Sequence, residues 1–439
     1  MTIPQDIVPN LTDPHNTASN GPAALTEETI EDFHGEEHLS RVRSEVPKDY
    51  DLVILSSFGG PEGQDDVIPF LRNVTAGRGI PDERLEEVAT HYRANGGVSP
   101  INAQNRALLA ELSATLKEKG PDIPITWANR NWEPYVKEVV QQAYDDGARK
   151  ILVLATSAYP GYSSCRQYRE DYGIALEELG LTGKLEIDKV RQHFDAPGFV
   201  QSFEEGLREG LRDVRERIAA LTHPAAGNDT IRVLFCTHSV PTSAANEAGP
   251  RGVDYEGGSV YVEKHLEVAR AVLAEVERKE PALLENVEWE LVYQSRSGPP
   301  TMPWLEPDVN DAIEALDGKV DGIVLVPLGF VSDHMEVKWD LDTEALNTCQ
   351  QLGIAATRTP TPGVHPAYVE SLRQLIAERV SSTATATDPA EIDANRHGAC
   401  ASRGWFDSCN PDCCKPARAK EQKPTIATYT GEDAQAGAR

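Results

Sequence analysis

The sequence predicts an α/β protein made of two similar doubly wound halves, each with a parallel, Rossmann-like sheet, and a ligand cleft between them. Two observations predict this fold class. Short runs rich in Val, Ile and Leu recur along the chain, and longer stretches with helical spacing of apolar residues separate them. Because strands that are apolar on both faces are typical of parallel sheets covered by helices, the alternation indicates repeated β–α units.

Six runs have the composition of buried strands. They are DLVILSS (51–57), ITWAN (125–129), KILVLATS (150–157), IRVLFCTHS (231–239), WELVYQS (289–295) and DGIVLVPLG (321–329). Helices are predicted between and after them, at 101–118, 133–146, 198–221, 259–279 and 366–380. Ligands of such folds lie beyond the carboxyl ends of the strands, so the residues that follow each strand are the first candidates for a functional site.

The 439 residues are enough for two or three domains. Residues 1–48 mix Pro, Asn, Thr and acidic side chains, which predicts a disordered or loosely attached acidic arm. The stretch THPAAGNDT (222–230) separates an N-terminal α/β half, 49–225, from a C-terminal α/β half, 226–380. Residues 381–439 form a polar linker and a cysteine-rich tail, with too few apolar residues to fold without a ligand.

The charge balance narrows the range of partners. Seventy acidic and 42 basic side chains give a formal net charge of −28, which argues against nucleic acid or an anionic membrane surface as the main partner. A cationic ligand fits better, although many cytoplasmic proteins are acidic for solubility alone. No apolar run approaches the ~20 residues that span a bilayer, and the N-terminus has no secretory or transit signal. We therefore expect a cytoplasmic protein.

Titratable side chains follow two of the predicted strands. His238 comes directly after IRVLFCT, and it is either a buried core histidine or an imidazole that accepts protons or binds a transition metal. Glu336, Asp340 and Glu344 follow DGIVLVPLG at the spacing i, i+4, i+8, which on a helix forms one column of carboxylates. This column either faces solvent or binds cations and relays protons. His238 and Glu336 together are the N and O ligands expected for a divalent first-row metal.

Two Gly-Gly turns add further candidates. SSFGGPE (56–62) follows the first strand, and HYRANGGVSPIN (91–102) carries Ser99 just before a predicted helix. Paired glycines allow a tight turn or a close approach of the backbone to a ligand. The first turn lacks the GxGxxG spacing of a dinucleotide site.

Four of the seven cysteines lie close together near the C-terminus, and Cys165 follows a predicted strand. In a reducing compartment such a group indicates metal or iron–sulfur ligation rather than disulfides. Adjacent Cys413 and Cys414 are not expected both to ligate on steric grounds. The expected ligands of a [2Fe–2S] cluster are Cys165, Cys400, Cys409 and one of the adjacent pair, for which we favour Cys414 over Cys413. The alternatives are a structural thiol at Cys165 and a zinc site made by the tail alone.

Five sequence blocks together resemble the ferrochelatase family. In family order they are SFGGPE, GRGIPDERLEEVATHYRANGGVSPIN, THSVP, YQSRSGPPTMPWLEPD (293–308) and VPLGFVSDHMEVKWDLD (326–342). The resemblance spans about residues 50–380, and the tail is similar to that of actinobacterial members, which resemble coproporphyrin III ferrochelatases with a [2Fe–2S] cluster. It implies a chelatase-like fold and the insertion of Fe²⁺ into a porphyrin, with loss of two pyrrole protons, in heme biosynthesis.

The resemblance also implies roles for the titratable residues. His238 would accept a pyrrole proton, or bind iron on its way into the ring. Glu336 would face His238 as the second iron ligand or proton acceptor. Asp340 and Glu344 would extend an acidic relay away from the metal.

The resemblance places Phe58, Ser99 and Tyr168 in the porphyrin cleft, where the ring must be gripped and distorted to expose its nitrogen lone pairs. Charge and motif position add Arg78 and Arg296 as partners of the propionates. Phe58 is a departure, because many coproporphyrin-type members carry at this position a Tyr whose oxygen ligates the product iron. A Phe has no such oxygen, and it does not settle which porphyrin is the substrate.

The expected partners are coproporphyrin III and Fe²⁺, with a monomeric protein in transient contact with other heme-pathway enzymes. Protoporphyrin IX is the alternative substrate. A cobalt chelatase of related fold is a second enzyme reading, but its relatives lack the SFGGP and SRSGPPxxPW blocks. A non-catalytic tetrapyrrole carrier or iron–sulfur sensor would predict loss of His238 or Glu336, and both are present.

Overall fold

The computed structural model describes residues 42–77, 79–221, 226–227, 229–249, 254–298, 301–386, 388–396, 398–400, 404–416 and 422–428. Most of the predicted N-terminal arm, part of the predicted boundary at 222–230, and Arg78 lie outside the described residues. None of the helices in these ranges is long and apolar enough to cross a membrane.

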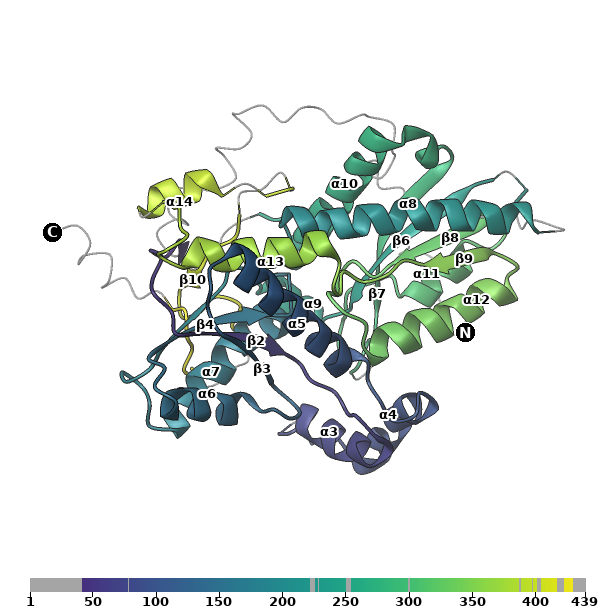
Figure 1. Cartoon of the computed structure of the whole chain (residues 1–439). Helices are drawn as coiled ribbons and strands as arrows, with labels where there is room; N and C mark the ends of the chain where they lie inside the picture. The colour runs from purple at the N-terminus through teal and green to yellow at the C-terminus, as the bar shows by residue number, and fades with distance from the viewer. Residues whose placement is uncertain are drawn as a thin grey trace. The chain divides into compact units, whose positions relative to one another are not determined.

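Two four-stranded sheets, parallel throughout, form the framework, so the predicted α/β class is confirmed (Figure 1). The first has the order β3-β2-β4-β5 and the second the order β7-β6-β8-β9. Their bounds are β2 Leu52–Ser57, β3 Ile125–Asn129, β4 Lys150–Ala155, β5 Glu186–Lys189, β6 Ile231–His238, β7 Val287–Gln294, β8 Gly322–Val326 and β9 Ala355–Arg358. In the first sheet β3 pairs with one edge of β2 and β4 with the other edge. In the second sheet β7 and β8 flank β6 in the same way. The carboxyl ends of β2 and β6 are therefore switch points, where such folds place their ligands.

Helices cover both faces of each sheet. On the first sheet α5 (Ile101–Lys119) and α13 (Pro366–Arg379) lie on one face, and α6 (Val136–Asp145) and α7 (Gln167–Glu178) on the other. On the second sheet α8 (Pro197–Ala219) and α10 (Val260–Lys279) lie opposite α11 (Val309–Ala315) and α12 (Leu346–Gln351) (Figure 1). Helix α8 precedes the second sheet in the chain, yet it packs on β8 and β9.

One hydrophobic core is shared by both sheets. It contains Leu152 of β4, Phe199 of α8 and Val324 of β8. Because side chains alternate along a strand, Ile54 of β2 points instead into a second core beneath α6 and α7. The remaining helical pair, α3 (Val67–Val74) and α4 (Asp82–Ala94), has a small core of its own: Val67, Phe70, Leu71, Leu85 and Ala89.

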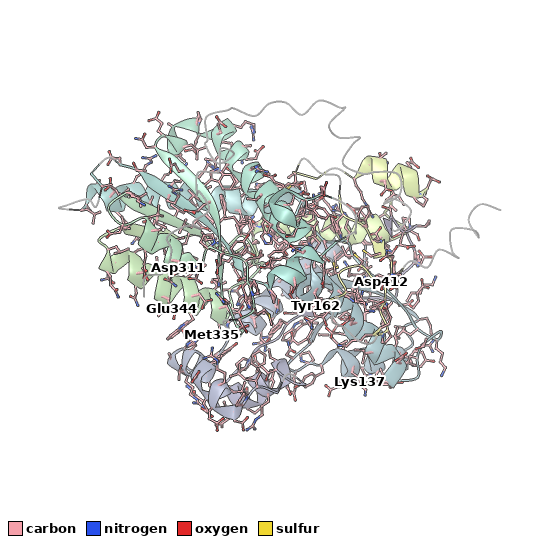
Figure 2. All side chains as sticks on the ribbon, turned by 180° about the vertical axis from the view of Figure 1, so that it is seen from behind. Lys137, Tyr162, Asp311, Met335, Glu344 and Asp412 are labelled. Carbon is pink, nitrogen blue, oxygen red and sulfur yellow. The ribbon has the colours of Figure 1, made fainter. Side chains whose placement is uncertain are left out.

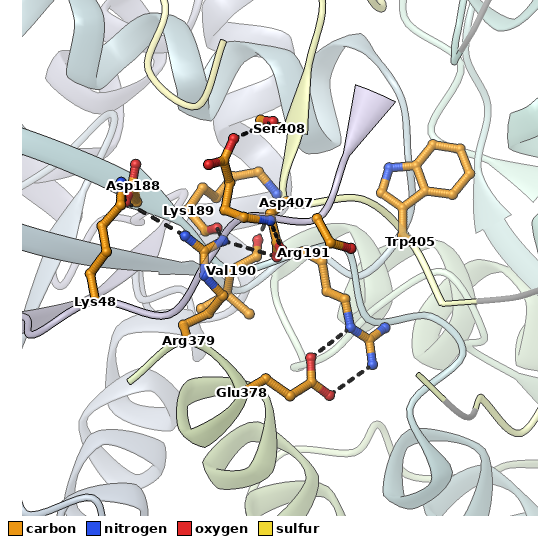
Figure 3. A network of polar contacts seen from close by, with 12 residues as sticks. Lys48, Asp188, Lys189, Val190, Arg191, Glu378, Arg379, Trp405, Asp407 and Ser408 are labelled. Atoms are coloured by element: carbon orange, nitrogen blue, oxygen red, sulfur yellow. Dashed lines mark hydrogen bonds and ion pairs between the residues drawn. The ribbon is translucent and has the colours of Figure 1, made fainter. Parts of the chain in front are cut away.

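The C-terminal tail docks through backbone pairing and buried charge. Its strand β10 (Ser408–Cys409) pairs antiparallel with β1 (Val42–Arg43). Asp407, fully buried, forms ion pairs with Arg379 at 3.0 Å and with Arg396 (Figure 3). The short helix α14 (Pro389–Asn395) leads into this segment. A tail poor in apolar residues is thus tied to the body by ion pairs.

Candidate active site

An imidazole and a carboxylate meet where two neighbouring strands of the second sheet end. His238 is the last residue of β6, and Glu336 lies in the segment that follows β8. His238 Nε2 is 3.4 Å from Glu336 Oε1, and the two side chains remain 32% and 45% exposed. The adjacency of β6 and β8 therefore brings together two residues that are about a hundred positions apart in the chain.

The two groups hold each other in their charged forms. Burial opposes protonation of His238, but the Glu336 and Asp340 carboxylates outweigh it and raise the pKa of the imidazole. Burial likewise opposes ionisation of Glu336, but His238 and His334 outweigh it and lower the pKa of that carboxyl. The pair therefore holds a proton on His238, and it can bind a metal as imidazole and carboxylate only after His238 has given that proton up.

His334 is a neighbour of this pair that the sequence analysis did not single out. Its Nδ1 lies 3.9 Å from Glu336 Oε2 and accepts a hydrogen bond from the Glu336 backbone N–H at 3.2 Å. Burial lowers the pKa of His334, which keeps it largely neutral. Its position two residues before Glu336, in the sequence SDHME, could have indicated that His334 lies beside this carboxylate.

Asp340 lies four residues after Glu336, on the π-helix η5 (Val337–Ala345). Its Oδ2 accepts hydrogen bonds from the Ser295 hydroxyl and from Gln294 Nε2, the latter at 3.3 Å. Burial raises the pKa of Asp340 to about 7, with Glu336 adding to the effect and the Ser295 hydrogen bond opposing it. A carboxyl of this pKa gains and loses a proton near neutral pH, as a relay requires.

Glu344 lies near the end of the same π-helix. Figure 2 labels both Glu344 and Met335. The column predicted from i, i+4, i+8 spacing assumes about 3.6 residues a turn, whereas a π-helix bonds residue i to i+5 and winds more slowly. Glu344 Oε1 accepts a hydrogen bond from Trp339 Nε1 at 2.9 Å. Trp339 in turn stacks on His91 of α4, with 4.2 Å between ring centroids, so Glu344 is held at the α4 wall of the site.

The predicted cleft residues gather around an arginine that the sequence analysis missed. The Arg130 guanidinium lies 5.0 Å from the ring centroid of Tyr168 and 5.9 Å from that of Phe58. Phe58 is 38% exposed, whereas Tyr168 is buried. Arg130 also pairs with Asp171 at 2.5 Å. The side chain of Phe58 is thus available to a ligand, and Tyr168 lies behind the guanidinium.

Ser99 is buried against the first Gly-Gly turn. A Cβ added to Gly60 would lie only 2.7 Å from the Ser99 Cβ, so the two segments approach as closely as a glycine allows. Tyr92 of α4 is a further residue missed from the sequence. Burial raises its pKa and Glu336 and Asp340 add to the effect, which places the phenol near both carboxyls. Arg296 forms a 3.5 Å ion pair with Glu306.

Four cysteine thiols from two distant parts of the chain lie together. Cys165 belongs to the π-helix η2 (Tyr162–Arg166), and Cys409, Cys413 and Cys414 belong to the tail; all four are buried. The Cys413 and Cys414 sulfurs are 3.8 Å apart, and Cys414 accepts a hydrogen bond from the Gly249 N–H at 3.1 Å. A hydrogen bond from Cys413 lowers the pKa of Cys409, with Arg169 and Lys189 contributing.

The charges that most affect Cys400 come from residues other than these four thiols. The charged groups that act on it are Asp195, Glu267 and Lys264, and burial raises the pKa of its thiol. Cys413, which the sequence analysis set aside, occupies the place beside Cys409 and Cys414.

Across the part of the chain that the structure describes, no group of three or more His, Cys, Asp or Glu side chains is arranged to hold a metal ion. The His238–Glu336 pair is accordingly a two-donor site, which leaves most coordination positions of a metal for other ligands.

Fold and site together define an α/β protein with an imidazole–carboxylate pair between two strand ends and a carboxyl of near-neutral pKa beside it. The family model described as Ferrochelatase matches residues 50–380. The chain is 51% identical to the coproporphyrin III ferrochelatase of Leifsonia xyli, over 88% of this chain and 95% of the relative. It is 48% identical to the coproporphyrin III ferrochelatase of Tropheryma whipplei, over 84% of this chain and 90% of the relative. The chain belongs to the ferrochelatase family.

A relative named simply ferrochelatase, from Rhodopirellula baltica, is 42% identical over 84% of this chain and 95% of the relative. Among solved structures, SirB from Bacillus subtilis with Fe³⁺ aligns with a TM-score of 0.41 and 13% identity, over 77% of this chain and 99% of that one.

Proposed function

We propose that this protein is a coproporphyrin III ferrochelatase, a lyase of heme biosynthesis that inserts Fe²⁺ into the macrocycle and releases two pyrrole protons. Family membership supports the reaction class, and the relatives from Leifsonia, Tropheryma and Streptomyces named coproporphyrin III ferrochelatase support the substrate. The observation that carries the proposal is the 3.4 Å approach of His238 Nε2 to Glu336 Oε1 at the meeting point of β6 and β8.

The two-donor site suits a metal that is passed on rather than kept. His238 and Glu336 would hold Fe²⁺ through one nitrogen and one oxygen, while the four pyrrole nitrogens supply the remaining ligands in turn. After it has released the iron and is deprotonated, His238 would accept a pyrrole proton, because the neighbouring carboxylates favour its protonated form.

Protons released at the macrocycle need a route to solvent. Asp340, with a pKa of about 7, is suited to take a proton from the His238–Glu336 pair and to give it up again. Glu344 would receive it at the end of η5, where Trp339 fixes the carboxylate. We propose this order, Glu336 to Asp340 to Glu344, as the acidic relay.

We propose that the porphyrin lies between Phe58 and the His238 side of the site, with Ser99 and Tyr168 shaping the cleft wall. The exposed ring of Phe58 supports contact with the flat macrocycle. Arg296 is a partner for a propionate once it exchanges its 3.5 Å contact with Glu306.

The test is anaerobic Fe²⁺ insertion by the purified protein, followed by absorbance with coproporphyrin III and protoporphyrin IX side by side. We expect strong preference for coproporphyrin III. Preference for protoporphyrin IX would keep the chelatase and overturn the substrate. Failure with both, in protein that binds coproporphyrin III, would favour a tetrapyrrole carrier.

We also propose that Cys165, Cys409, Cys413 and Cys414, which are not arranged as metal ligands in this structure, would draw together around a [2Fe–2S] cluster, a one-electron redox centre. Four cysteines are the usual ligands of such a cluster, and the cations Arg169 and Lys189 beside them favour thiolates. The 3.8 Å approach of the Cys413 sulfur to that of Cys414 argues for Cys413 in place of Cys400.

Single Ser substitutions test this ligand set. Cys165→Ser and Cys413→Ser should lose the visible iron–sulfur absorption and the bound iron and sulfide, whereas Cys400→Ser should keep them. Loss of the bands in Cys400→Ser, with retention in Cys413→Ser, would restore the set predicted from the sequence.

We further propose that the protein acts in the cytoplasm as a monomer, in transient contact with other heme-pathway enzymes. Sedimentation of the holoprotein tests the oligomeric state: a mass of one 48.0 kDa chain is expected, and a stable dimer would contradict it.

A further inference from the structure

A chain of buried polar groups lies directly behind His238. It consists of Thr237, Tyr261, His265 and Tyr159, and we call it the Thr237 network. Thr237 Oγ1 is 2.8 Å from His265 Nε2 and 2.9 Å from the Tyr261 hydroxyl. All four side chains are buried. Buried polar groups need partners, and these groups supply them to one another.

The direction of each hydrogen bond follows from its partners. His265 Nδ1 lies 2.6 Å from the Tyr261 carbonyl, which can only accept, so Nδ1 carries the proton. Burial lowers the pKa of His265 to about 3, so the ring is neutral and its Nε2 accepts from the Thr237 hydroxyl. The one proton of the Tyr261 hydroxyl then faces two acceptors, the Thr237 hydroxyl oxygen and the backbone carbonyl of His238, each 2.9 Å away.

The network also reaches the segment that carries Glu336. Tyr159, which follows β4 of the first sheet, stacks on His265 with 3.6 Å between ring centroids. Its hydroxyl donates to the carbonyl of Leu328, in the turn after β8, at 3.1 Å. The same cluster therefore contacts the strand end that bears His238 and the turn that leads to Glu336.

The turn after β8 packs tightly against Thr237 at Gly329. Gly329 donates its N–H to the Cys236 carbonyl at 3.1 Å, and a Cβ added to Gly329 would lie 2.1 Å from Thr237 Oγ1. Thr237 is thus enclosed by Gly329, Tyr261 and His265. A shift of its side chain would move the adjacent His238.

We propose that Tyr261 and Thr237 are positioning residues for metal insertion: by hydrogen bonding they fix the backbone at His238 and so hold its imidazole opposite Glu336. This inference rests on the proposed role of the His238–Glu336 pair as the iron site. The residues touch neither metal nor porphyrin. A misplacement of about 1 Å at a reacting group can lower a rate by about a hundredfold, which makes such support worthwhile.

The test uses variants of the holoenzyme that remove one hydroxyl each. Tyr261→Phe and Thr237→Val should lower kcat for iron insertion about tenfold and leave KM for the porphyrin unchanged. Thr237→Ser keeps the hydroxyl and should restore most of the rate. Tyr368→Phe is the matched control, because its hydroxyl meets another buried histidine, His193, at 3.1 Å. The hydrogen bond of that pair involves neither Thr237 nor His238, so the control should match the wild type.

A second readout does not depend on turnover. In anaerobic calorimetry without porphyrin, the Fe²⁺ binding that is lost in His238→Ala defines the site. Tyr261→Phe should weaken that binding about tenfold, and should add nothing in the His238→Ala background. Unchanged kcat and unchanged Fe²⁺ affinity in Tyr261→Phe would overturn the inference, as would an effect that persists without His238. If the wild type inserted no iron but Tyr261→Phe still weakened Fe²⁺ binding at the His238 site, the proposed function alone would be refuted.

Discussion

Arg379 and Asp407 form a 3.0 Å ion pair between side chains that are 1% and 0% exposed. Arg379 ends α13, and Asp407 belongs to the tail, so buried charge joins the body to its C-terminal segment (Figure 3). Arg396 is the second partner of Asp407, and the Glu45 N–H donates to the same carboxylate at 2.9 Å. Burying this many charges is tolerable only while each keeps its partners.

Asp407→Asn should therefore destabilise the protein strongly. The substitution leaves two buried guanidinium groups without their shared anion, and breaking a buried pair costs about 3–5 kcal/mol in the free energy of unfolding. Urea denaturation measures the loss. Asp82→Asn, at the exposed pair with Arg72, is the control and should not move the midpoint. Equal midpoints for Asp407→Asn and the wild type would show that the tail is held by other contacts.

Stability should fall as the pH drops below about 6.5. Burial lowers the pKa of His193, and that of His265, to about 3, against about 6.5 in an unfolded chain. Between these values the unfolded state binds protons that the native state does not, so each histidine removes about 1.4 kcal/mol per pH unit as the pH falls. The midpoints of urea denaturation, measured between about pH 6.5 and pH 3, check this loss of stability. His193→Gln should flatten the slope, and an unaltered slope would contradict the assignment.

His238→Ala and Glu336→Ala should each lower iron insertion by about a hundredfold or more while the protein stays folded. His365 and Glu205 form a second His–Glu pair, 3.1 Å apart and outside the site. His365→Ala therefore removes a comparable contact and should insert iron at the wild-type rate. Near-normal turnover in His238→Ala would remove the proposed iron site.

Arg358 should prove important although it lies outside the site. Its guanidinium contacts Asp342 at 2.7 Å and Asp333 at 3.1 Å, and so ties the start of the His334–Glu336 segment to η5. Lys cannot reproduce this two-sided contact, so we expect Arg358→Lys to lower kcat about tenfold with little change in the porphyrin KM. Arg373→Lys, which alters a surface pair with Glu370, is the control. Full activity of Arg358→Lys would show that η5 holds its shape unaided.

Much of the framework follows from local patterns. The six predicted strands match β2, β3, β4, β6, β7 and β8, because most consist of buried apolar runs. β5 (EIDK) and β9 (AATR) were not predicted, since they are four-residue edge strands of mixed polarity. Placing candidates at strand ends singled out His238 and Glu336, because parallel strands bring their carboxyl ends to one edge.

What the sequence could not supply is long-range geometry. The π-helical winding of η5 depends on packing rather than on spacing, so the relation of Asp340 to Ser295 was not foreseeable. A steric argument set Cys413 aside, yet a positive φ of 56° at Cys414 turns the backbone so that both adjacent thiols are buried together. The ion pairs of Asp407 link segments that no local pattern relates.

The hydrophobic interior is divided into separate cores, and this division determines where the structure can open at the lowest free-energy cost. The two sheets share one continuous core, so prising them apart would expose large apolar surface at high free-energy cost. The α3–α4 pair has a separate core of five residues, and its His91 stacks on Trp339 of η5. Local opening is least costly where few contacts are lost. The small α3–α4 core is therefore the part of the site wall whose displacement would expose the least apolar surface.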